Sequence, residues 1–541
     1  MKKLIMLSFL MTYLIPAFAI KAQVSQEWVR TNNGSGNSND ESAAIIYDGH
    51  GNVIITGRAI STGNNNDFYT VKYNSSGVQQ WAVTYNGTAN NYDAASGLAA
   101  DNSGNVYVTG QSLNSSSNYD IALIKYNSAG VQQWVRIWNG TGDRDDIPNA
   151  ITADSSGNTY ITGYTQVSGL NSNYITLKYN PEGILQWSKE YNNPINSGDI
   201  AYYIKTDLNR NVYVTGTSTA LTTGSDFLTI KYTPNGDSSW VARYSGTTAS
   251  NEIPQGFGVD AAGNVYVTGF STGTGTGIDF VTLKYSSNGV QQWLARYDST
   301  GGQDIPEDLE VDGAGNVYVT GRTRINSSYN DFATIKYNPA GIRQWIAIYD
   351  NAPESRDDYG YDLVLDVLGN VYVTGNSQES GTNRDALTIK YNNSGIQQWV
   401  ARYDETNSEE TFGIVLDESN NIYTAGYSSG VNSDYLTIKY SQSVGINQIS
   451  NAVPGNIRLD QNYPNPFNPK TIIRFQLTEF SYVTLKIFNV LGNEIETLFS
   501  NKISAGIYSV EWDASNLSSG TYFYKLETEK YSDTKSMVLF K

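Results

Sequence analysis

The sequence predicts an all-β protein: an eight-bladed β-propeller of four-stranded antiparallel blades, followed by a small C-terminal β-sandwich. Three observations predict this class. A unit of about 53 residues recurs through most of the chain, each unit contains four strand-like runs, and residues 455–541 break the repeat. The 41 Tyr, 10 Trp and 50 Gly among 541 residues are typical of strands joined by tight turns.

The repeat is defined by a short phrase, a Lys-Tyr pair and a tryptophan. The phrase GNVYVTG occurs at Gly104–Gly110, Gly263–Gly269 and Gly315–Gly321, and close variants begin at positions 51, 157, 210, 369 and 420. The lysines of the pairs are Lys72, Lys125, Lys178, Lys231, Lys284, Lys336, Lys390 and Lys439. The tryptophans are Trp28, Trp81, Trp134, Trp187, Trp240, Trp293, Trp345 and Trp399.

One unit shows the four expected strands, at 256–260, 264–268, 280–285 and 291–297. Apolar or aromatic residues alternate with Thr, Lys or Arg along them, as a pleated sheet requires. Asp260 and Gly263 mark the first turn, and Gly289 marks the last. A single blade buries too little surface to be stable alone, so neighbouring blades are expected to stack on one another.

The phase of the repeat predicts how the array closes. The chain opens with a lone fourth strand, Gln26–Arg30, and the array ends at Tyr440 after a lone set of three. We expect the N-terminal strand to complete the last blade and leave no free sheet edge. An open array of repeats would have no use for such complementary ends.

The units resemble the SBBP-type β-propeller repeat family, whose pattern is D-x-x-GN-x-YVTG, then D-x-x-x-x-KY-x-x-x-G, then a Trp strand. The resemblance covers Val24–Tyr440. That family is nominally seven-bladed, which leaves a seven-bladed ring as the alternative. A looser similarity to quinoprotein propellers rests on Gly77-Val-Gln-Gln-Trp81, although Tyr73 stands where their docking Asp would be. It implies a quinoprotein-like oxidoreductase as a lesser alternative.

The first 22 residues are predicted to be a signal peptide. Lys2 and Lys3 precede a mostly apolar run, Leu4–Ile15, and Ala17-Phe18-Ala19 is a small-x-small cleavage site. The run is shorter than the ~20 residues that a spanning helix needs. We therefore expect an exported chain with no transmembrane helix after processing.

A second domain is predicted over 455–541, after a linker at 441–454 that has no charged residue. Alternating runs such as Tyr482–Phe488 indicate a β-sandwich of about seven strands. The segment resembles a type IX secretion system type A sorting domain. The residues that carry the resemblance include Asn465, Pro466, Phe467, Asn468, Pro469, Gly492, Gly506, Trp512, Gly520, Tyr522 and Lys541.

The resemblance to a sorting domain implies an address and a partner. It implies recognition by the type IX secretion machinery of a Bacteroidetes-type bacterium. The expected location is therefore outside the cell or on the outer-membrane surface.

The charge and the rare residues exclude several classes of function. The propeller segment holds 23 basic and 43 acidic side chains, a net charge of −20, which excludes nucleic-acid binding. There is no Cys, so disulfides, thiolate metal sites and cysteine nucleophiles are excluded. The single histidine, His50, lies at a variable turn position and is not expected to act in catalysis.

Acidic residues recur at three positions of the repeat. The first register starts each first strand and comprises Asp40, Asp93, Asp146, Asp199, Glu252, Asp304, Asp358 and Glu409. The second lies in the turn before each GNV phrase, where the carboxylate is expected to bond nearby amides. The third starts each third strand and comprises Asp67, Asp120, Asp226, Asp279, Asp331, Asp385 and Asp434, with Asn173 as the exception.

We expect the first register to form a ring around the channel mouth, because the first strand of a blade is innermost. Eight like charges would repel one another unless they were paired or neutralised. Pairing with the repeat lysines or with amides of the adjacent blade is one explanation. A bound cation, with calcium the best candidate, is the other.

The face with the long, unequal loops is where a ligand is expected to bind, for example beside 86–93, 141–149 and 351–358. A non-enzymatic binding or scaffold protein for a glycan or a protein ligand fits best. An extracellular polysaccharide-degrading enzyme that uses carboxylates of this face is the alternative. Five arginines lie in these loops without forming a recognisable motif: Arg144, Arg322, Arg324, Arg356 and Arg384.

Overall fold

The computed structural model describes residues 23–34, 38–60, 65–168, 171–246, 251–275, 277–299, 302–325, 329–351, 356–378, 383–405, 407–443, 446–450, 453–514 and 517–541. The predicted signal peptide lies outside these ranges. Within them every regular element is a strand, and no helix is long and apolar enough to cross a membrane. Two compact units are present, one over Val24–Ser441 and one that contains Gln442–Lys541.

The described residues of the first unit form eight four-stranded sheets, which we call blades 1 to 8. Blades 1 to 4 consist of β2 (Glu41–Tyr47), β3 (Asn52–Ile60), β4 (Asn66–Asn74), β5 (Gln79–Tyr85); β6 (Asp93–Ala100), β7 (Val106–Leu113), β8 (Tyr119–Tyr126), β9 (Gln132–Trp138); β10 (Asp146–Ala153), β11 (Thr159–Ser168), β12 (Asn171–Tyr179), β13 (Leu185–Tyr191); β14 (Asp199–Thr206), β15 (Val212–Ala220), β16 (Gly224–Tyr232) and β17 (Ser238–Tyr244).

Blades 5 to 8 follow the same order, except that the last one takes its fourth strand from the N-terminus. They consist of β18 (Ile253–Val259), β19 (Val265–Gly273), β20 (Gly277–Tyr285), β21 (Gln291–Tyr297); β22 (Ile305–Val311), β23 (Val317–Thr323), β24 (Asp331–Tyr337), β25 (Arg343–Tyr349); β26 (Asp358–Leu365), β27 (Val371–Gln378), β28 (Arg384–Tyr391), β29 (Gln397–Tyr403); β30 (Ser408–Leu416), β31 (Ile422–Ser429), β32 (Ser433–Ser443) and β1 (Gln23–Asn32).

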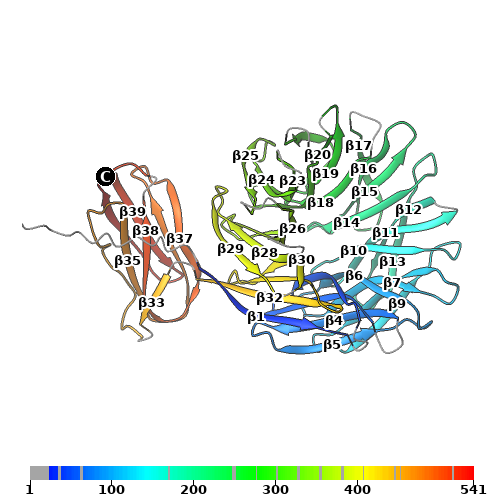
Figure 1. Cartoon of the computed structure of the whole chain (residues 1–541), viewed down its shortest axis with the longest axis horizontal. Coiled ribbons are helices and arrows are strands. Elements are labelled where there is room, and N and C mark those ends of the chain that lie inside the picture. The colour runs from blue at the N-terminus through cyan, green and yellow to red at the C-terminus, as the bar shows by residue number, and fades with distance from the viewer. Residues whose placement is uncertain are drawn as a thin grey trace, which may run out of the picture. The chain divides into compact units, whose positions relative to one another are not determined.

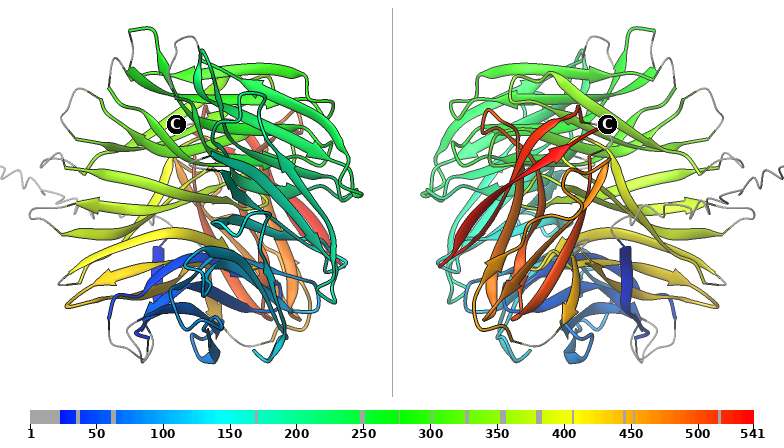
Figure 2. Two further views of the ribbon diagram at one scale, coloured as in Figure 1. Left: turned by 90° about the vertical axis from the view of Figure 1, so that its right-hand side faces the viewer. Right: turned by 90° about the vertical axis from the view of Figure 1, so that its left-hand side faces the viewer.

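The blades follow one another around a ring (Figures 1 and 2). The first strand of every blade contacts the first strand of the next one, and the series returns from β30 to β2. In Figure 1 the strands β6, β10, β14, β18 and β26 lie toward the middle of the ring, and β9, β13 and β17 lie toward its rim. The β-propeller class predicted from the sequence is confirmed.

The outer-strand tryptophans of blades 1 to 6 and 8 each join one blade to the next. Trp81 Nε1 donates to the carbonyl of Ser128 at 3.1 Å, and Trp187 Nε1 donates to that of Pro234 at 3.1 Å. Trp28 on β1 makes the same bond to Ser75 of blade 1 at 3.1 Å. The strand that closes the ring therefore uses the same contact as the other blade junctions.

The glycine of the turn that receives the tryptophan is required by this packing. Gly77 has φ of 74°, in the left-handed region, and a Cβ there would lie 2.8 Å from the indole of Trp28. This requirement explains why Gly recurs just before the Val-Gln-Gln-Trp segment in the repeat.

The second acidic register behaves as the sequence predicts. Asp260 Oδ1 accepts the N–H groups of Ala262 and Asn264 at 2.9 Å, and Oδ2 accepts the Tyr266 hydroxyl at 2.9 Å. Burial opposes ionisation of Asp260, but these bonds outweigh it and lower the pKa of the carboxyl. The turn carboxylates therefore hold the hairpin between the first two strands of each blade.

The second unit contains two four-stranded sheets around one apolar core. Their strands are β33 (Ile446–Ser450), β34 (Arg458–Leu459), β35 (Lys470–Leu477), β36 (Ser481–Phe488), β37 (Glu494–Ile503), β38 (Gly506–Asp513), β39 (Gly520–Thr528) and β40 (Ser532–Leu539). β33 pairs with β38 and lies inside the stretch predicted as a linker. This uncharged stretch therefore contributes one short strand to the second unit.

We expect Trp28→Ala to destabilise the propeller by about 3–5 kcal/mol, because it empties a buried site at the closure of the ring. The Trp28 side chain is 8% exposed and packs against Tyr73 and Tyr423. Chemical unfolding followed by circular dichroism measures the change. Gln26→Ala, at an exposed position of the same strand, is the matched control. Equal stability of the two variants would contradict the role given to Trp28.

Candidate functional site

Every inner strand carries a β-bulge at the same register. In blade 1 the pairing skips one residue between Ser42 and Ala44, and in blade 8 it skips one between Thr411 and Gly413. A bulged residue has no ladder partner and is often re-aimed toward a functional site. The residues skipped in blades 1 to 8 are Ala43, Ser96, Asn149, Tyr202, Gln255, Glu307, Tyr361 and Phe412.

The bulged residues differ from blade to blade, although the strands that flank them repeat. Blades 1 to 3 have Ala, Ser and Asn, and blades 4 to 8 have larger polar, acidic or aromatic side chains. Ser96 and Asn149 donate to the carbonyls of Pro148 and Ala201 in the following inner strands, at 2.9 and 2.7 Å. These two side chains tie the ring together. Tyr361 and Phe412 have a different environment.

An aromatic row runs across the inner strands of blades 7 and 8. The rings of Tyr359 and Tyr361 stack at 6.1 Å, Tyr361 meets Phe412 edge-on at 5.0 Å, and Phe412 meets Tyr427 at 5.6 Å. Phe412 is 37% exposed. The row thus ends in an apolar ring face that is accessible to a ligand.

Phe412 lies in the wall of a pocket of about 660 Å³. The pocket is formed by blades 7, 8 and 1, and its wall consists of Glu41, Ser42, Gln378, Arg384, Ser408, Glu410, Phe412, Tyr427, Ser429 and Ser433. Its size falls within the range of small-molecule sites, which is ~300–1,000 Å³. We call this pocket, with the aromatic row, the mouth site.

Ion pairs hold the polar side chains of the mouth site. Arg384 Nη1 lies 3.1 Å from Glu410 Oε1, and Arg58 Nη2 lies 2.6 Å from Glu41 Oε2. Asn376 Nδ2 donates to the second oxygen of Glu410 at 2.8 Å. The wall therefore offers fixed donors and acceptors beside the exposed ring of Phe412.

Carboxyl groups of blades 6 and 7 lie on the inner strands below the aromatic row. Asp308 and Asp362 hydrogen-bond to each other, and burial followed by the charge of Asp308 raises the pKa of Asp362 well above its usual value. Burial raises the pKa of Glu307 to about 7 against the opposing effect of Arg322. These acids can hold protons near neutral pH, as general acids do.

The first acidic register is buried in the propeller, and its arrangement as a ring at the channel mouth stays a prediction. All eight of its side chains are at most 1% exposed. Asp93 and Asp146 accept the N–H groups of Gly87 and Gly140, six residues earlier, each at 2.6 Å. These carboxylates accept amides of the loop that leads into their own strand, not the amides of an adjacent blade that were considered from the sequence.

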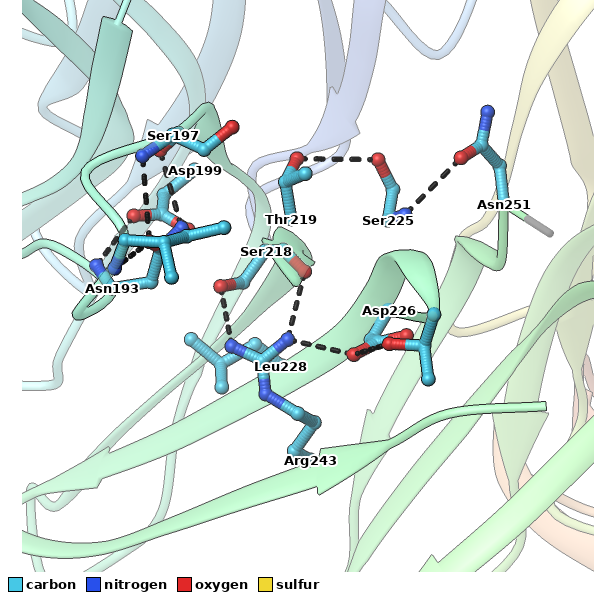
Figure 3. Close-up of polar contacts among 12 residues, drawn as sticks. Asn193, Ser197, Asp199, Ser218, Thr219, Ser225, Asp226, Leu228, Arg243 and Asn251 are labelled. Carbon is cyan, nitrogen blue, oxygen red and sulfur yellow. Dashed lines mark hydrogen bonds and ion pairs between the residues drawn. The ribbon is translucent and has the colours of Figure 1, made fainter. Parts of the chain in front are cut away.

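Figure 3 shows polar contacts of the first-register Asp199 and the third-register Asp226 in blade 4. Asp199 accepts bonds from Asn193 and Ser218. Arg243 donates to Ser218 Oγ at 2.6 Å and to Asp226 Oδ2 at 2.8 Å. Burial raises the pKa of Asp93 in blade 2, and the charge of Asp67 in blade 1 raises it further, so carboxylates of neighbouring blades repel one another. We call the two registers together the acid belt.

The arginine of the belt is present in only three blades. Arg243, Arg296 and Arg402 pair with Asp226, Asp279 and Asp385 at 2.8, 2.7 and 2.7 Å in blades 4, 5 and 7. The equivalent residues of blades 1, 2, 6 and 8 are uncharged: Thr84, Ile137, Ile348 and Thr31.

Blade 3 shows that these pairs are matched by charge. Glu190 stands in the place of the arginine, and Asn173 replaces the third-register acid and donates to Glu190 at 3.4 Å. A carboxylate in place of the guanidinium therefore comes together with the loss of the facing carboxylate, as electrostatics requires.

One group of three carboxylates within the described ranges has oxygens that all lie within 4.8 Å of one another, and it comprises Asp279, Asp298 and Asp304. Only Asp304 belongs to the first register. Arg296 pairs with Asp279 in the same place. Calcium binding by the first register stays a prediction.

The structure gathers some of the arginines that the sequence left scattered. Arg322 and Arg384 both lie over the ring of Tyr359, and Arg324 donates to Asn330, which bonds the Tyr359 hydroxyl. His50 is exposed and its Nε2 lies 3.2 Å from the carbonyl of Asn102, in agreement with a turn role.

The mouth site was missed in the sequence because its residues come from different blades and are not periodic. A comparison of the eight first strands with one another would have revealed it, since they diverge at the bulge while the second strands keep the GNVYVTG phrase.

In the second unit, residues of the predicted sorting motif meet in the core. Phe467 packs against Trp512 at 5.5 Å, and Trp512 against Tyr522 at 5.8 Å. Asn465 Oδ1 accepts the N–H of Val538 at 2.9 Å, so the Asn-Pro-Phe-Asn-Pro segment is fixed to the last strand. Lys541 N donates to Ser519 Oγ at 2.9 Å. Residues of the motif therefore pack the core of the domain and fix its first segment and its C-terminus.

Segments of both units match known sequence families. Residues 461–540 match the family described as secretion system C-terminal sorting domain. Residues 133–171 and 345–381 match the SBBP family, described as beta-propeller repeat. The chain carries SBBP β-propeller repeats and a type IX sorting domain. The sorting domain indicates export through the type IX system, typical of Bacteroidetes.

Individual proteins give little further guidance. An uncharacterised WD repeat-containing protein of Acanthamoeba polyphaga mimivirus is 21% identical over 501 residues, 68% of this chain and 35% of the viral protein. The chain thus spans about a third of the length of that relative.

Two solved structures share only a distant overlap with the chain. A fungal alcohol oxidase of the AA5 family, in complex with copper, aligns with TM-score 0.40 and 11% identity over 96% of this chain and 100% of the oxidase. A eukaryotic initiation factor aligns with TM-score 0.35 and 7% identity, over 67% of this chain and 88% of the factor. At these scores neither one informs the function.

We expect the propeller to lose stability as the pH rises from 4 to 7. Burial raises the pKa values of Asp146, Asp331 and Asp358 to about 6. An acid whose pKa is raised by folding stabilises the fold fully below its unfolded pKa, and this contribution is lost as the pH rises through the folded value. Each such group accounts for roughly 2–3 kcal/mol. Urea unfolding at several pH values measures the effect.

Ile348→Arg tests the same belt from the opposite direction. Ile348 of blade 6 is equivalent to Arg402 of blade 7, and Asp331 is equivalent to Asp385. The new guanidinium would therefore lie beside Asp331 and should stabilise the propeller at pH 7 by about 1–2 kcal/mol. Gln344→Arg adds the same charge at an exposed position of the same strand and is the control. Equal effects of the two arginines, or stability that rises from pH 4 to 7, would contradict the account.

Proposed function

We propose that the protein is an exported binding protein, released or held at the cell surface, that binds a glycan at the mouth site. The observation that carries the proposal is the exposed Phe412 ring in one pocket with the Arg384–Glu410 pair and with Glu41, whose carboxylate pairs with Arg58 outside the pocket wall. An aromatic face packs against the C–H face of a sugar ring, and paired donors and acceptors bond its hydroxyls.

A small ligand fits this site better than a protein partner does. The pocket is concave and has the volume of a small-molecule site, whereas protein interfaces bury about 800 Å² on each partner. The rest of the repeat serves to fix the blades. The acidic residues that recur in each repeat are buried or hydrogen-bonded in turns, so they are unavailable to a ligand.

The second candidate is a polysaccharide-degrading enzyme. The observation in its favour is the hydrogen-bonded pair of Asp308 and Asp362, next to Glu307 and the aromatic row, in which burial and the charge of Asp308 raise the pKa of Asp362 well above its usual value. Release of reducing ends from a bound polysaccharide would support the enzyme. Asp362→Asn would then abolish turnover and leave binding in place.

We expect Phe412→Ala to weaken glycan binding about tenfold, which corresponds to about 1.4 kcal/mol. The full chain is applied to a saccharide array, and dissociation constants of the ligands found are measured by isothermal titration calorimetry. Leu208→Ala, at a side chain that is 90% exposed in a turn of blade 4, is the control. If no saccharide binds, or if Phe412→Ala binds as well as the parent, the proposal is wrong.

We also expect a chain that ends at residue 454 to accumulate in the periplasm of a type IX-competent bacterium. The truncation removes the whole sorting motif and leaves the strands of the propeller intact. Cell fractionation and immunoblotting locate the product. The full chain is the control, and surface display of the truncated chain would exclude the sorting domain as the export signal.

A further inference from the structure

The ring of Tyr359 gathers two cations next to the mouth site. The guanidinium carbons of Arg322 and Arg384 lie 5.2 and 5.1 Å from its centroid. The ring is fixed by the stack with Tyr361 and by the bond from Asn330 Nδ2 to its hydroxyl at 3.2 Å. Each guanidinium is attracted to the face of the ring, so the fixed ring holds both charges in place.

Most of the hydrogen-bonding capacity of these two arginines is unused. Arg322 Nη1 bonds Glu307 at 2.7 Å and Arg384 Nη1 bonds Glu410 at 3.1 Å. In the part of the chain that the structure describes, their Nε and Nη2 groups make no hydrogen bond. The side chains are 26% and 35% exposed, so the remaining N–H groups can reach a ligand.

A third arginine adds positive charge at the same place. Arg324 Nη2 donates to Asn330 Oδ1 at 3.4 Å. Its Nε is buried without a hydrogen-bond partner. A buried guanidinium N–H that is left unsatisfied costs free energy, so this group also favours an acceptor with negative charge.

Three carboxylates lie beside this cluster: Glu307 pairs with Arg322, Glu410 pairs with Arg384, and Asp357 accepts Asn330 Nδ2 at 2.9 Å. Because the pKa of Glu307 is raised to about 7, Arg322 lacks a full counter-charge near neutral pH. The three arginines lie in a propeller whose net charge is −20, so their gathering at one place requires a specific reason.

We propose that the saccharide bound at the mouth site is anionic, and that Arg384 and Arg322 bind its carboxylate or sulfate groups. This inference rests on the proposed glycan-binding function. A guanidinium binds a carboxylate or sulfate through two parallel N–H bonds, which gives the pair both strength and direction. Phe412 contacts the sugar ring, and the arginines select for its charge.

The test compares polysaccharides that differ only in charge. The full chain is titrated with polygalacturonate and its methyl ester, and with dextran sulfate and dextran. We expect a charged form to bind at least tenfold more tightly than its neutral counterpart. Binding to polygalacturonate assigns a carboxylate ligand, and binding to dextran sulfate assigns a sulfate ligand. The affinity should also rise as the pH falls from 8 to 6, as Glu307 takes up a proton.

Variants separate specific recognition from general attraction. Arg384→Gln and Arg322→Gln should each weaken binding of the charged form at least tenfold. Arg384→Lys should bind more tightly than Arg384→Gln but less tightly than the parent, because lysine keeps the charge and lacks the two parallel N–H donors of the guanidinium. Arg144→Gln removes an exposed arginine of the same face and should have little effect. Circular dichroism of each variant confirms that the blades remain folded.

The outcomes distinguish this inference from the function on which it rests. If neutral saccharides bind as well as charged ones and Phe412→Ala weakens both, the glycan site stands and the charge selection is wrong. If Arg144→Gln lowers the affinity as much as Arg384→Gln, the attraction is non-specific and the inference is also wrong. If neither these probes nor the saccharide array gives binding, both proposals fail.

Discussion

The contact between one blade and the next is the interaction on which the rest of the propeller depends. A four-stranded blade has two apolar faces and cannot bury either of them alone. The outer-strand tryptophans of blades 1 to 6 and 8 bond a turn of the following blade, and the inner strands contact one another around the whole ring. Once these contacts are fixed, every loop and every bulge has a defined place, and the mouth site can draw residues from three blades.

The repeated and the divergent residues have separate tasks. Acids that recur in every blade hold loops, turns and blade junctions, so their number does not indicate a ligand. The bulged position is the place where the inner strand leaves the ladder, and it is there that the blades differ. Selection for a binding site can alter Tyr361 and Phe412 without disturbing the hydrogen bonds that carry the ring. The acid belt illustrates the opposite case, in which Asn173 accompanies Glu190 because the local charge must balance.

The architecture could be predicted from the sequence because residues that recur at fixed spacing reveal the strands and turns of each repeat. The GNVYVTG phrase, the Lys-Tyr pair and the Trp fix four strands, and the lone strand around Trp28 fixes the closure. The direction of a side chain at a strand end is not given by spacing, so the burial of Asp93 and Asp146 under their own loops could not be foreseen. The spacing of the repeat does not reveal a bulge either, because a bulged residue changes the strand pairing and leaves the length of the repeat unchanged. Phe412 and Arg384 meet only after two blades have packed.

Closure of the ring by the N-terminal strand also constrains the order in which the protein can fold. Ser441 bonds Glu27 across 414 positions of sequence, so β1 obtains its partner only when the array up to β32 is present. Pairings of such high contact order form slowly. Until then β1 is an unpaired strand that could join another chain. Glu27 and Arg30 beside Trp28 place charges on β1 while it is unpaired, and charged edge strands resist association with other chains.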